Sequence, residues 1–214
     1  MNAVLNAAIG EQPPVTRAYL LLSTFLMALC SLDLLSPFQL YLNWHLVLTQ
    51  FQIWRIFTCF LFFGTFGLPF FWNAYVLVFY CASLEGMSFR GKPADFLWML
   101  LSGSWMLLFI AYFFDASYFI SGAMIDIMTY VWGRRNSNAR VHVIFLTVRA
   151  PYLPWALAFV SLLMGAPVQD HIYGIIVGHT YYFFEDVYPL MPTSKGFRLF
   201  RTPWILRVLC QQQD

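Results

Sequence analysis

The chain has 214 residues, of which 60% are hydrophobic and only 10% are charged, and its formal net charge is +2. This composition excludes an ordinary soluble domain and a disordered chain, and basic residues spread between apolar segments give no indication of a nucleic-acid partner. Cys30, Cys59, Cys81 and Cys210 include no close pair, so neither a disulfide framework nor a zinc site is indicated, and no metal or cofactor is expected. The sequence predicts an all-α protein that crosses a membrane several times.

Apolar segments follow one another along the chain, and a membrane-spanning helix needs about 20 such residues. Polar residues interrupt Leu34–Trp54 at intervals that suit an amphipathic segment lying in the membrane surface, so this segment is not counted as a span. The remaining segments are predicted to form six spans: Ala18–Leu32, Ile56–Leu84, Phe96–Phe114, Ala116–Trp132, Ala150–Gln169 and Ile172–Phe184.

The basic residues predict the orientation, because Lys and Arg in short loops gather on the cytoplasmic side of a membrane. With six spans and a cytoplasmic amino terminus, every Lys and Arg except Arg55 lies on that side. We therefore expect a cytosolic amino-terminal segment over residues 1–17, a membrane domain over residues 18–189 with a long first loop at 33–68, and a short cytosolic tail over residues 190–214.

Arg55 is the only charged residue between Asp33 and Glu85. An arginine at bilayer depth costs roughly 2.5–3.5 kcal/mol on insertion scales, so it is expected to face protein, water or a lipid headgroup. Trp54 beside it belongs to the residue types that anchor at the membrane interface. The pair predicts a first loop that lies in or dips into the membrane surface, with Arg55 bound to lipid phosphate or to neighbouring backbone. A simple interfacial anchor and a functional role both remain open.

Two predicted spans are short for a bilayer. Ala18–Leu32 and Tyr118–Trp132 have about 15 residues each, hence roughly 22 Å of helix, against a hydrocarbon core of about 30 Å. Short spans exposed to lipid thin the bilayer around them. We therefore hypothesise local membrane thinning, with short helices enclosed inside the bundle as the alternative.

Polar and small residues inside the spans indicate further sites. Gly174 and Gly178 lie one turn apart on one helix face, a spacing that permits close helix packing. Asn73, Asp126 and His179 are candidates to line a hydrophilic cavity open to the cytoplasm, because intramembrane polar groups usually face a bundle interior or a wet cavity. Asp126 is the sharpest case, and its alternative is a carboxylate at a helix end already in water.

These residues, in their order and spacing, resemble the derlins, proteolytically inactive members of the rhomboid superfamily. The resemblance covers nearly the whole chain from residue 13 to about residue 205. The matching stretches are Pro13–Tyr19, Ser36–Tyr41, Phe51–Gly64 with Trp54-Arg55, Gly86–Phe96, Tyr130–Arg135, Ala150–Leu157 and Gly174–Pro189.

The resemblance implies a six-helix rhomboid-like bundle in the endoplasmic reticulum membrane, with both termini cytosolic. It implies a non-catalytic role in endoplasmic-reticulum-associated degradation, in which misfolded proteins are recognised and moved to the cytosol for the proteasome. The family's Trp-Arg motif falls on Trp54 and Arg55, and its GxxxG motif on Gly174 and Gly178. Implied partners are misfolded substrates, a membrane RING ubiquitin ligase, an AAA+ unfoldase reached directly or through an adaptor, membrane lipids and further copies of the chain.

The expected mechanism is that a thinned bilayer and a cytosol-open polar cavity shorten the dry path of a polypeptide through hydrocarbon, where each unsatisfied backbone group costs several kcal/mol. An intramembrane serine protease is the alternative, with Ser121 and His179 as nucleophile and base. Phe119 breaks the Gly-x-Ser-Gly pattern of rhomboid proteases, which argues against it. A solute transporter is disfavoured because no repeat relates the two halves.

Overall fold

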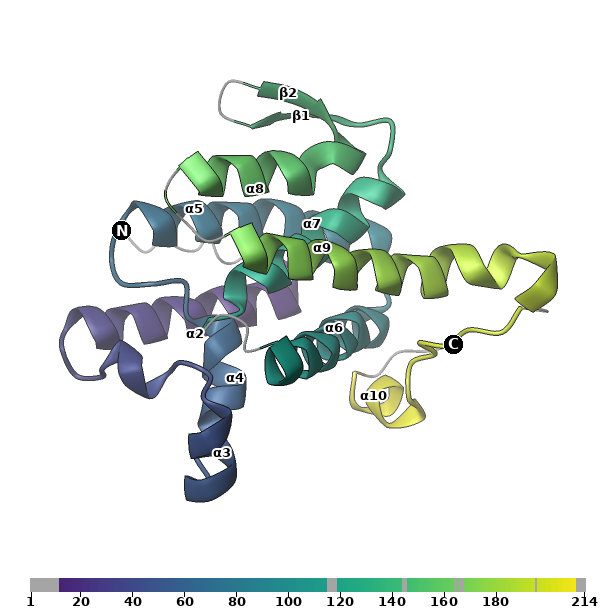
Figure 1. Ribbon diagram of the computed structural model, residues 1–214. Helices are drawn as coiled ribbons and strands as arrows, with labels where there is room; N and C mark the ends of the chain where they lie inside the picture. The colour runs from purple at the N-terminus through teal and green to yellow at the C-terminus, as the bar shows by residue number, and fades with distance from the viewer. Residues whose placement is uncertain are drawn as a thin grey trace.

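The computed structural model describes residues 12–114, 119–143, 146–163, 165, 168–194 and 196–210. Within them, each predicted span overlaps a helical segment, and these segments form the body of the structure (Figure 1). Each segment contains one α-helix: α2 Pro14–Ser31, α5 Leu68–Val76, α6 Pro93–Phe114, α7 Ser121–Arg135, α8 Leu153–Leu163 and α9 Val168–Tyr182. The π-helical stretches η2 Leu77–Cys81 and η3 Leu84–Ser88 lengthen the segment of α5, and η5 Phe183–Val187 lengthens that of α9.

The chain between α2 and α5 forms a first loop with its own short helices, η1 Pro37–Gln39, α3 Trp44–Gln50 and α4 Trp54–Leu61. The predicted span over residues 56–84 is therefore wrong in its first part, because α4 belongs to the loop. The helix breaks at Gly64, whose φ of 106° lies in the left-handed region that favours glycine. It begins again at Leu68, where Pro69 occupies a position in the first turn that proline tolerates.

By length and composition, two helices in the described part of the chain, α2 and α6, are long and apolar enough to cross a membrane. Both carry large apolar side chains on their outer faces, among them Phe25 on α2 and Trp105 and Phe109 on α6. Exposed apolar surface of this extent is unfavourable in water and suits contact with lipid.

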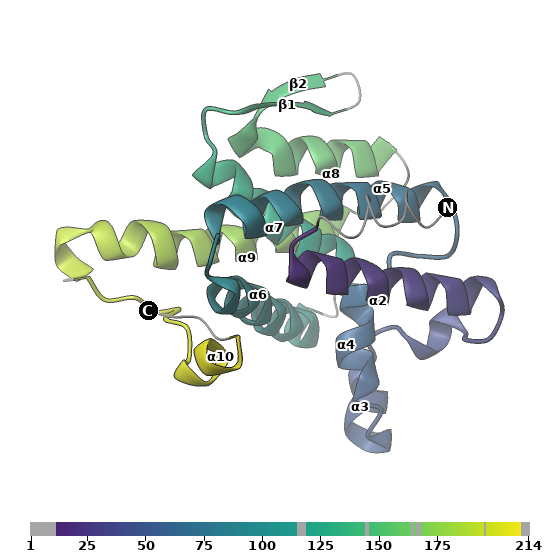
Figure 2. The same ribbon diagram turned by 180° about the vertical axis from the view of Figure 1, so that it is seen from behind.

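Helix α7 lies at the centre of the bundle, where every residue from Ala123 to Gly133 is buried. It packs against α9, α8, α6, α4 and the π-helical segment after α5 (Figure 2). A helix buried on all sides has no amphipathic pattern in its sequence.

A β-hairpin connects α7 to α8, and the expectation of an all-α protein missed it. The strands β1 Arg140–Val143 and β2 Leu146–Arg149 pair antiparallel, with Arg140 opposite Arg149. Alternation of charged or polar residues with valine at residues 140–143 has the period of two that a half-buried strand requires. The 3-10 turn η4 Ala150–Tyr152 then leads into α8, and the hairpin lies on the outer side of that helix (Figures 1 and 2).

The carboxyl-terminal chain folds back onto the bundle rather than extending away from it. After the 3-10 turns η6 Tyr188–Leu190 and η7 Pro192–Ser194, it returns toward α6 and forms the short helix α10 Trp204–Leu209, the last element in the described residues. The Thr202 hydroxyl donates a hydrogen bond of 2.6 Å to the Asp95 carboxylate in the first turn of α6.

Candidate functional site

Arg55 holds the first loop together from the first turn of α4. Its Nη1 donates hydrogen bonds of 2.9 Å to the carbonyl oxygens of Phe38 and Tyr41, and its Nε donates one of 2.6 Å to Oε1 of Gln52. The guanidinium also lies over the Tyr41 ring, 4.9 Å from its centroid. The residue is only 5% exposed, and the acceptors for these hydrogen bonds all belong to the loop itself. Of the two partners expected from the sequence, the structure shows neighbouring backbone.

Trp54, the preceding residue, is 52% exposed. Its indole Nε1 donates to the carbonyl oxygen of Gln39, 3.3 Å away. Ile53 and Phe57 are exposed beside it. Helix α4 is therefore two-sided, with Arg55 and Cys59 inside and an outer face of large apolar side chains that suits the membrane interface.

Gly174 and Gly178 lie where α9 crosses α7. A Cβ atom on Gly174 would lie 2.5 Å from the carbonyl oxygen of Ala123 and 2.6 Å from the Cβ of Asp126. One on Gly178 would lie 2.9 Å from the Cβ of Tyr130. These separations are too short for any side chain, so the two helices reach this distance only because both positions are glycine.

A third glycine, Gly133 near the end of α7, makes an even closer contact that the sequence reasoning did not single out. A Cβ there would collide with the backbone carbonyl of Ala150 at the start of η4. The chain that leads into α8 thus packs directly against the end of α7 that is predicted to be cytoplasmic. Gly133 lies in the stretch Tyr130–Arg135 that carries the family resemblance, but it has no partner glycine at a packing spacing that would mark it in the sequence.

Asp126 is 1% exposed, and its Oδ2 lies 2.6 Å from Nδ1 of His171 on α9. The structure therefore gives this carboxylate a side-chain partner on α9. His179 is exposed and contacts the Tyr130 hydroxyl through Nδ1 at 2.7 Å, while Asn73 is half-buried on α5. The three residues expected to share a polar cavity lie in three different environments.

A polar pocket of about 410 Å³ lies instead where the first turn of α6 meets the ends of α7 and α9. Arg135 makes two hydrogen bonds to the Asp186 carboxylate, 2.8 and 2.9 Å long, and lies over the Phe89 ring. Burial raises the pKa of Glu185 to about 6, although Arg198, 3.6 Å away, lowers it. The ionisable residues lining the pocket carry both signs of charge: Lys92, Asp95, Arg135, Glu185, Asp186 and Arg198.

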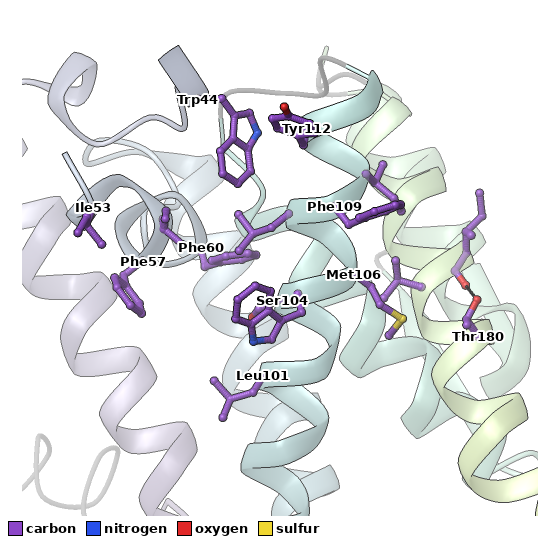
Figure 3. Close-up of a pocket in the computed structure, with 16 residues that line it drawn as sticks. Trp44, Ile53, Phe57, Phe60, Leu101, Ser104, Met106, Phe109, Tyr112 and Thr180 are labelled. Atoms are coloured by element: carbon purple, nitrogen blue, oxygen red, sulfur yellow. Dashed lines mark hydrogen bonds between the residues drawn. The ribbon is translucent and has the colours of Figure 1, made fainter. Parts of the chain in front are cut away.

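A larger groove of about 960 Å³ lies between the first loop and helices α6 and α9 (Figure 3). Its two aliphatic hydroxyls, on Ser104 and Thr180, donate to carbonyls within their own helices, and most of the other lining side chains are apolar or aromatic. Trp44 and Tyr112 meet edge to face at one end, with ring centroids 5.4 Å apart. No sequence pattern predicts this groove, which is lined chiefly by Trp44, Phe57, Phe60, Leu101, Trp105 and Phe109.

Glu85 is a buried carboxylate that the sequence reasoning also missed. It accepts hydrogen bonds from the backbone N–H groups of Val15 and Thr16, 3.0 and 2.8 Å long, and from the Thr16 hydroxyl at 2.8 Å. These donors belong to the first turn of α2, where backbone N–H groups lack helical partners and favour a negative charge. Glu85 thus joins the beginning of the first helix to the end of the second helical segment.

The described residues do not bring Ser121 and His179 together as a catalytic pair. The Ser121 hydroxyl donates 2.8 Å to the carbonyl oxygen of Phe62, whereas His179 contacts Tyr130, roughly 13 Å farther along α7 at about 1.5 Å per residue. A serine nucleophile requires its base within hydrogen-bond reach.

The fold and these sites define a helical membrane protein with a first loop built around a buried arginine and a central helix pair packed through glycines. The model of the Der1-like family matches residues 12–204, and the chain belongs to that family, which confirms the resemblance recognised in the sequence.

Several curated relatives are similar over most of their length. Derlin-2.2 of Arabidopsis thaliana is 41% identical over 93% of this chain and 85% of its own. Derlin-2 of Oryza sativa subsp. japonica is 38% identical over 93% of this chain and 83% of its own. A probable derlin-2 homolog of Dictyostelium discoideum is 37% identical over 94% of this chain and 81% of its own.

Proposed function

We propose that the protein is a non-catalytic factor of endoplasmic-reticulum-associated degradation, which recognises misfolded proteins and assists their movement to the cytosol. Membership of the Der1-like family supports this role. The observation that carries it is the apolar groove of about 960 Å³ bounded by α4, which bears Trp54 and Arg55, and by α6 and α9. An apolar segment of a substrate polypeptide fits such a surface, and binding it requires no bond to be broken.

The proposed topology has six crossings of the endoplasmic reticulum membrane, with both termini in the cytosol. The six helical segments and the distribution of Lys and Arg support it. In this arrangement the first loop lies in the opposite, lumenal leaflet, and the polar pocket at Arg135 and Glu185 opens toward the cytosol.

Membrane thinning in this proposal comes from α8 rather than from α7. Both are short, with 15 residues in α7 and 11 in α8, hence roughly 22 and 16 Å of helix. Because α7 is enclosed, its length places no demand on the lipid. Helix α8 exposes Trp155, Phe159 and Leu163, so lipid beside it would meet a helix much shorter than the hydrocarbon core of about 30 Å.

The two family motifs take separate roles in this mechanism. Trp54 holds α4 in the lumenal interface while Arg55 keeps the loop folded, and Gly174 and Gly178 hold α9 against α7 so that the groove keeps its shape. Directional force comes from a partner AAA+ unfoldase on the cytosolic side, and a membrane RING ubiquitin ligase or a second copy of the chain completes the passage.

A degradation assay tests the proposal. A misfolded reporter is followed by cycloheximide chase in cells that lack the protein and are complemented with the wild type, with Trp54→Ala/Arg55→Ala or with Ser121→Ala/His179→Ala. We expect the first double variant to leave the reporter undegraded and the second to restore its degradation. Failure of the second variant at normal expression, with loss of a cleaved fragment, would overturn the non-catalytic role.

A further inference from the structure

The outward face of the β-hairpin carries positive charge that the described residues do not neutralise. Arg140 lies directly opposite Arg149, and His142 opposite Thr147, and all four side chains are exposed. Val141 and the other buried positions of the hairpin lie on the opposite face, toward α8. The pleat therefore sorts the strands into an apolar inner face and a basic outer face.

The pairing of two arginines is unfavourable by itself. Side chains directly opposite one another on antiparallel strands have Cβ atoms about 4.5–5.5 Å apart, and like charges in this position destabilise the pair. Among the residues that the structure describes, neither Arg140 nor Arg149 has a side-chain hydrogen bond or an ion pair. An anion between the two guanidinium groups would remove the repulsion, and their planar N–H donors match the oxygens of a phosphate.

The position of the pair indicates where such an anion comes from. Arg149 is followed within two turns by Tyr152 and Trp155, which are 63% and 56% exposed. Exposed tyrosine and tryptophan of this kind mark the boundary between the hydrocarbon core and the headgroups. Both views of the ribbon place the hairpin beyond α8, on the side away from α9 (Figures 1 and 2). The two arginines thus lie beside residues that suit the level of the lipid phosphates.

We propose that Arg140 and Arg149 bind the phosphate of an acidic phospholipid headgroup. The lipid would hold the hairpin, and through η4 the beginning of α8, at the membrane surface. The short α8 is the helix with the greatest mismatch to the bilayer, so a fixed lipid at its end would set its depth. This inference rests on the proposed topology, in which the connection between α7 and α8 lies at the cytosolic membrane surface.

Lipid binding to the purified full chain tests the site. The protein in neutral detergent micelles is titrated with dioleoyl phosphatidic acid or with dioleoyl phosphatidylcholine, and native mass spectrometry measures the bound fraction. We expect Arg140→Gln/Arg149→Gln to weaken binding of the phosphatidic acid by at least about tenfold, because two basic side chains near the surface contribute to each bound acidic lipid. Binding of phosphatidylcholine should not change.

The matched control is Arg90→Gln/Arg201→Gln, which removes the same charge from two exposed positions in other connections. It should leave the affinity for phosphatidic acid within about twofold. Equal weakening by both double variants would overturn the site in favour of a general attraction by net charge. Displacement of the bound lipid by millimolar inorganic phosphate would assign the pair to free phosphate and overturn the lipid proposal.

The lipid titration and the degradation assay fail separately. Loss of selectivity for the acidic lipid would overturn this site without changing the result for Trp54→Ala/Arg55→Ala in cells. The exposed positions of Arg140 and Arg149 also mean that their replacement should not unfold the chain, which thermal unfolding without added lipid verifies.

Discussion

The first loop and the contact between α7 and α9 both depend on a close approach of two segments, but they achieve it with opposite residue types. At the helix contact, Gly174 and Gly178 bring α9 against α7 by having no side chain. In the loop, the long side chain of Arg55 reaches carbonyls 14 and 17 residues earlier in the chain. The first contact depends on shape and the second on hydrogen bonds to a buried charge, so the two regions should respond differently to substitution.

The largest effect is expected for Gly174→Val. Its side chain would overlap the Ala123 carbonyl and the Asp126 side chain, neither of which can move without shifting α7. Overpacking typically costs about 1–3 kcal/mol and occasionally more, and contact with backbone puts this variant at the upper end, about 3 kcal/mol. Thermal unfolding in detergent measures the loss. Gly122→Ala is the control, since nothing lies within 4 Å of the added Cβ, and it should leave stability unchanged or slightly higher.

A smaller loss is expected for Arg55→Met, which keeps much of the side-chain volume but leaves the Phe38 and Tyr41 carbonyls without their donor. Unsatisfied buried acceptors cost about 1–3 kcal/mol. The loss should appear first as faster proteolysis within residues 33–68, with α7 and α9 still protected. If the helix pair instead became sensitive at the same rate, the loop and the bundle would not be separate units. Arg90→Met, at an exposed position, serves as the control.

The end of α9 should add a pH dependence to the stability of the protein. The pKa of Glu185 is raised to about 6 by burial, so the unfolded chain releases this proton more readily than the folded one. The contribution of Glu185 to stability is therefore fully present below its ordinary pKa near 4.5 and is lost as pH rises through 6. After discounting for partial exposure, we expect a change of about 1 kcal/mol. Unfolding of Glu185→Gln between pH 4.5 and 7.5 should show no such slope if the assignment holds.

The smallest change in stability is expected for Trp54→Ala, because the side chain is half exposed and makes one long hydrogen bond. We expect a loss below about 1 kcal/mol in detergent. Its effect should appear in lipid. Quenchers placed at the lumenal interface should reduce the fluorescence of a label on α4 less strongly than they do in the wild type. A thermal loss as large as that of Gly174→Val would contradict the separation between anchoring and packing.

The sequence predicted the positions of the helices well, because the length of an apolar segment and the Gly, Pro and charged residues that interrupt it are local properties. It also singled out Arg55, since a lone charge in an apolar stretch is visible without any partner, and the spacing of Gly174 and Gly178. The sequence did not predict the hairpin, whose two strands have only four residues each and pack against α8. It also extended one span too far, because the break at Gly64 depends on a left-handed backbone conformation.

The partners of the polar residues were decided by tertiary structure alone. Asp126 meets His171 and Glu85 meets Thr16 across 45 and 69 residues of chain, separations at which no local pattern acts. The apolar groove likewise lies between three apolar segments, the first loop, α6 and α9. It exists only where their side chains do not fill the space between them. Local chemistry thus determined which residues are unusual in this protein, while packing determined what each of them contacts.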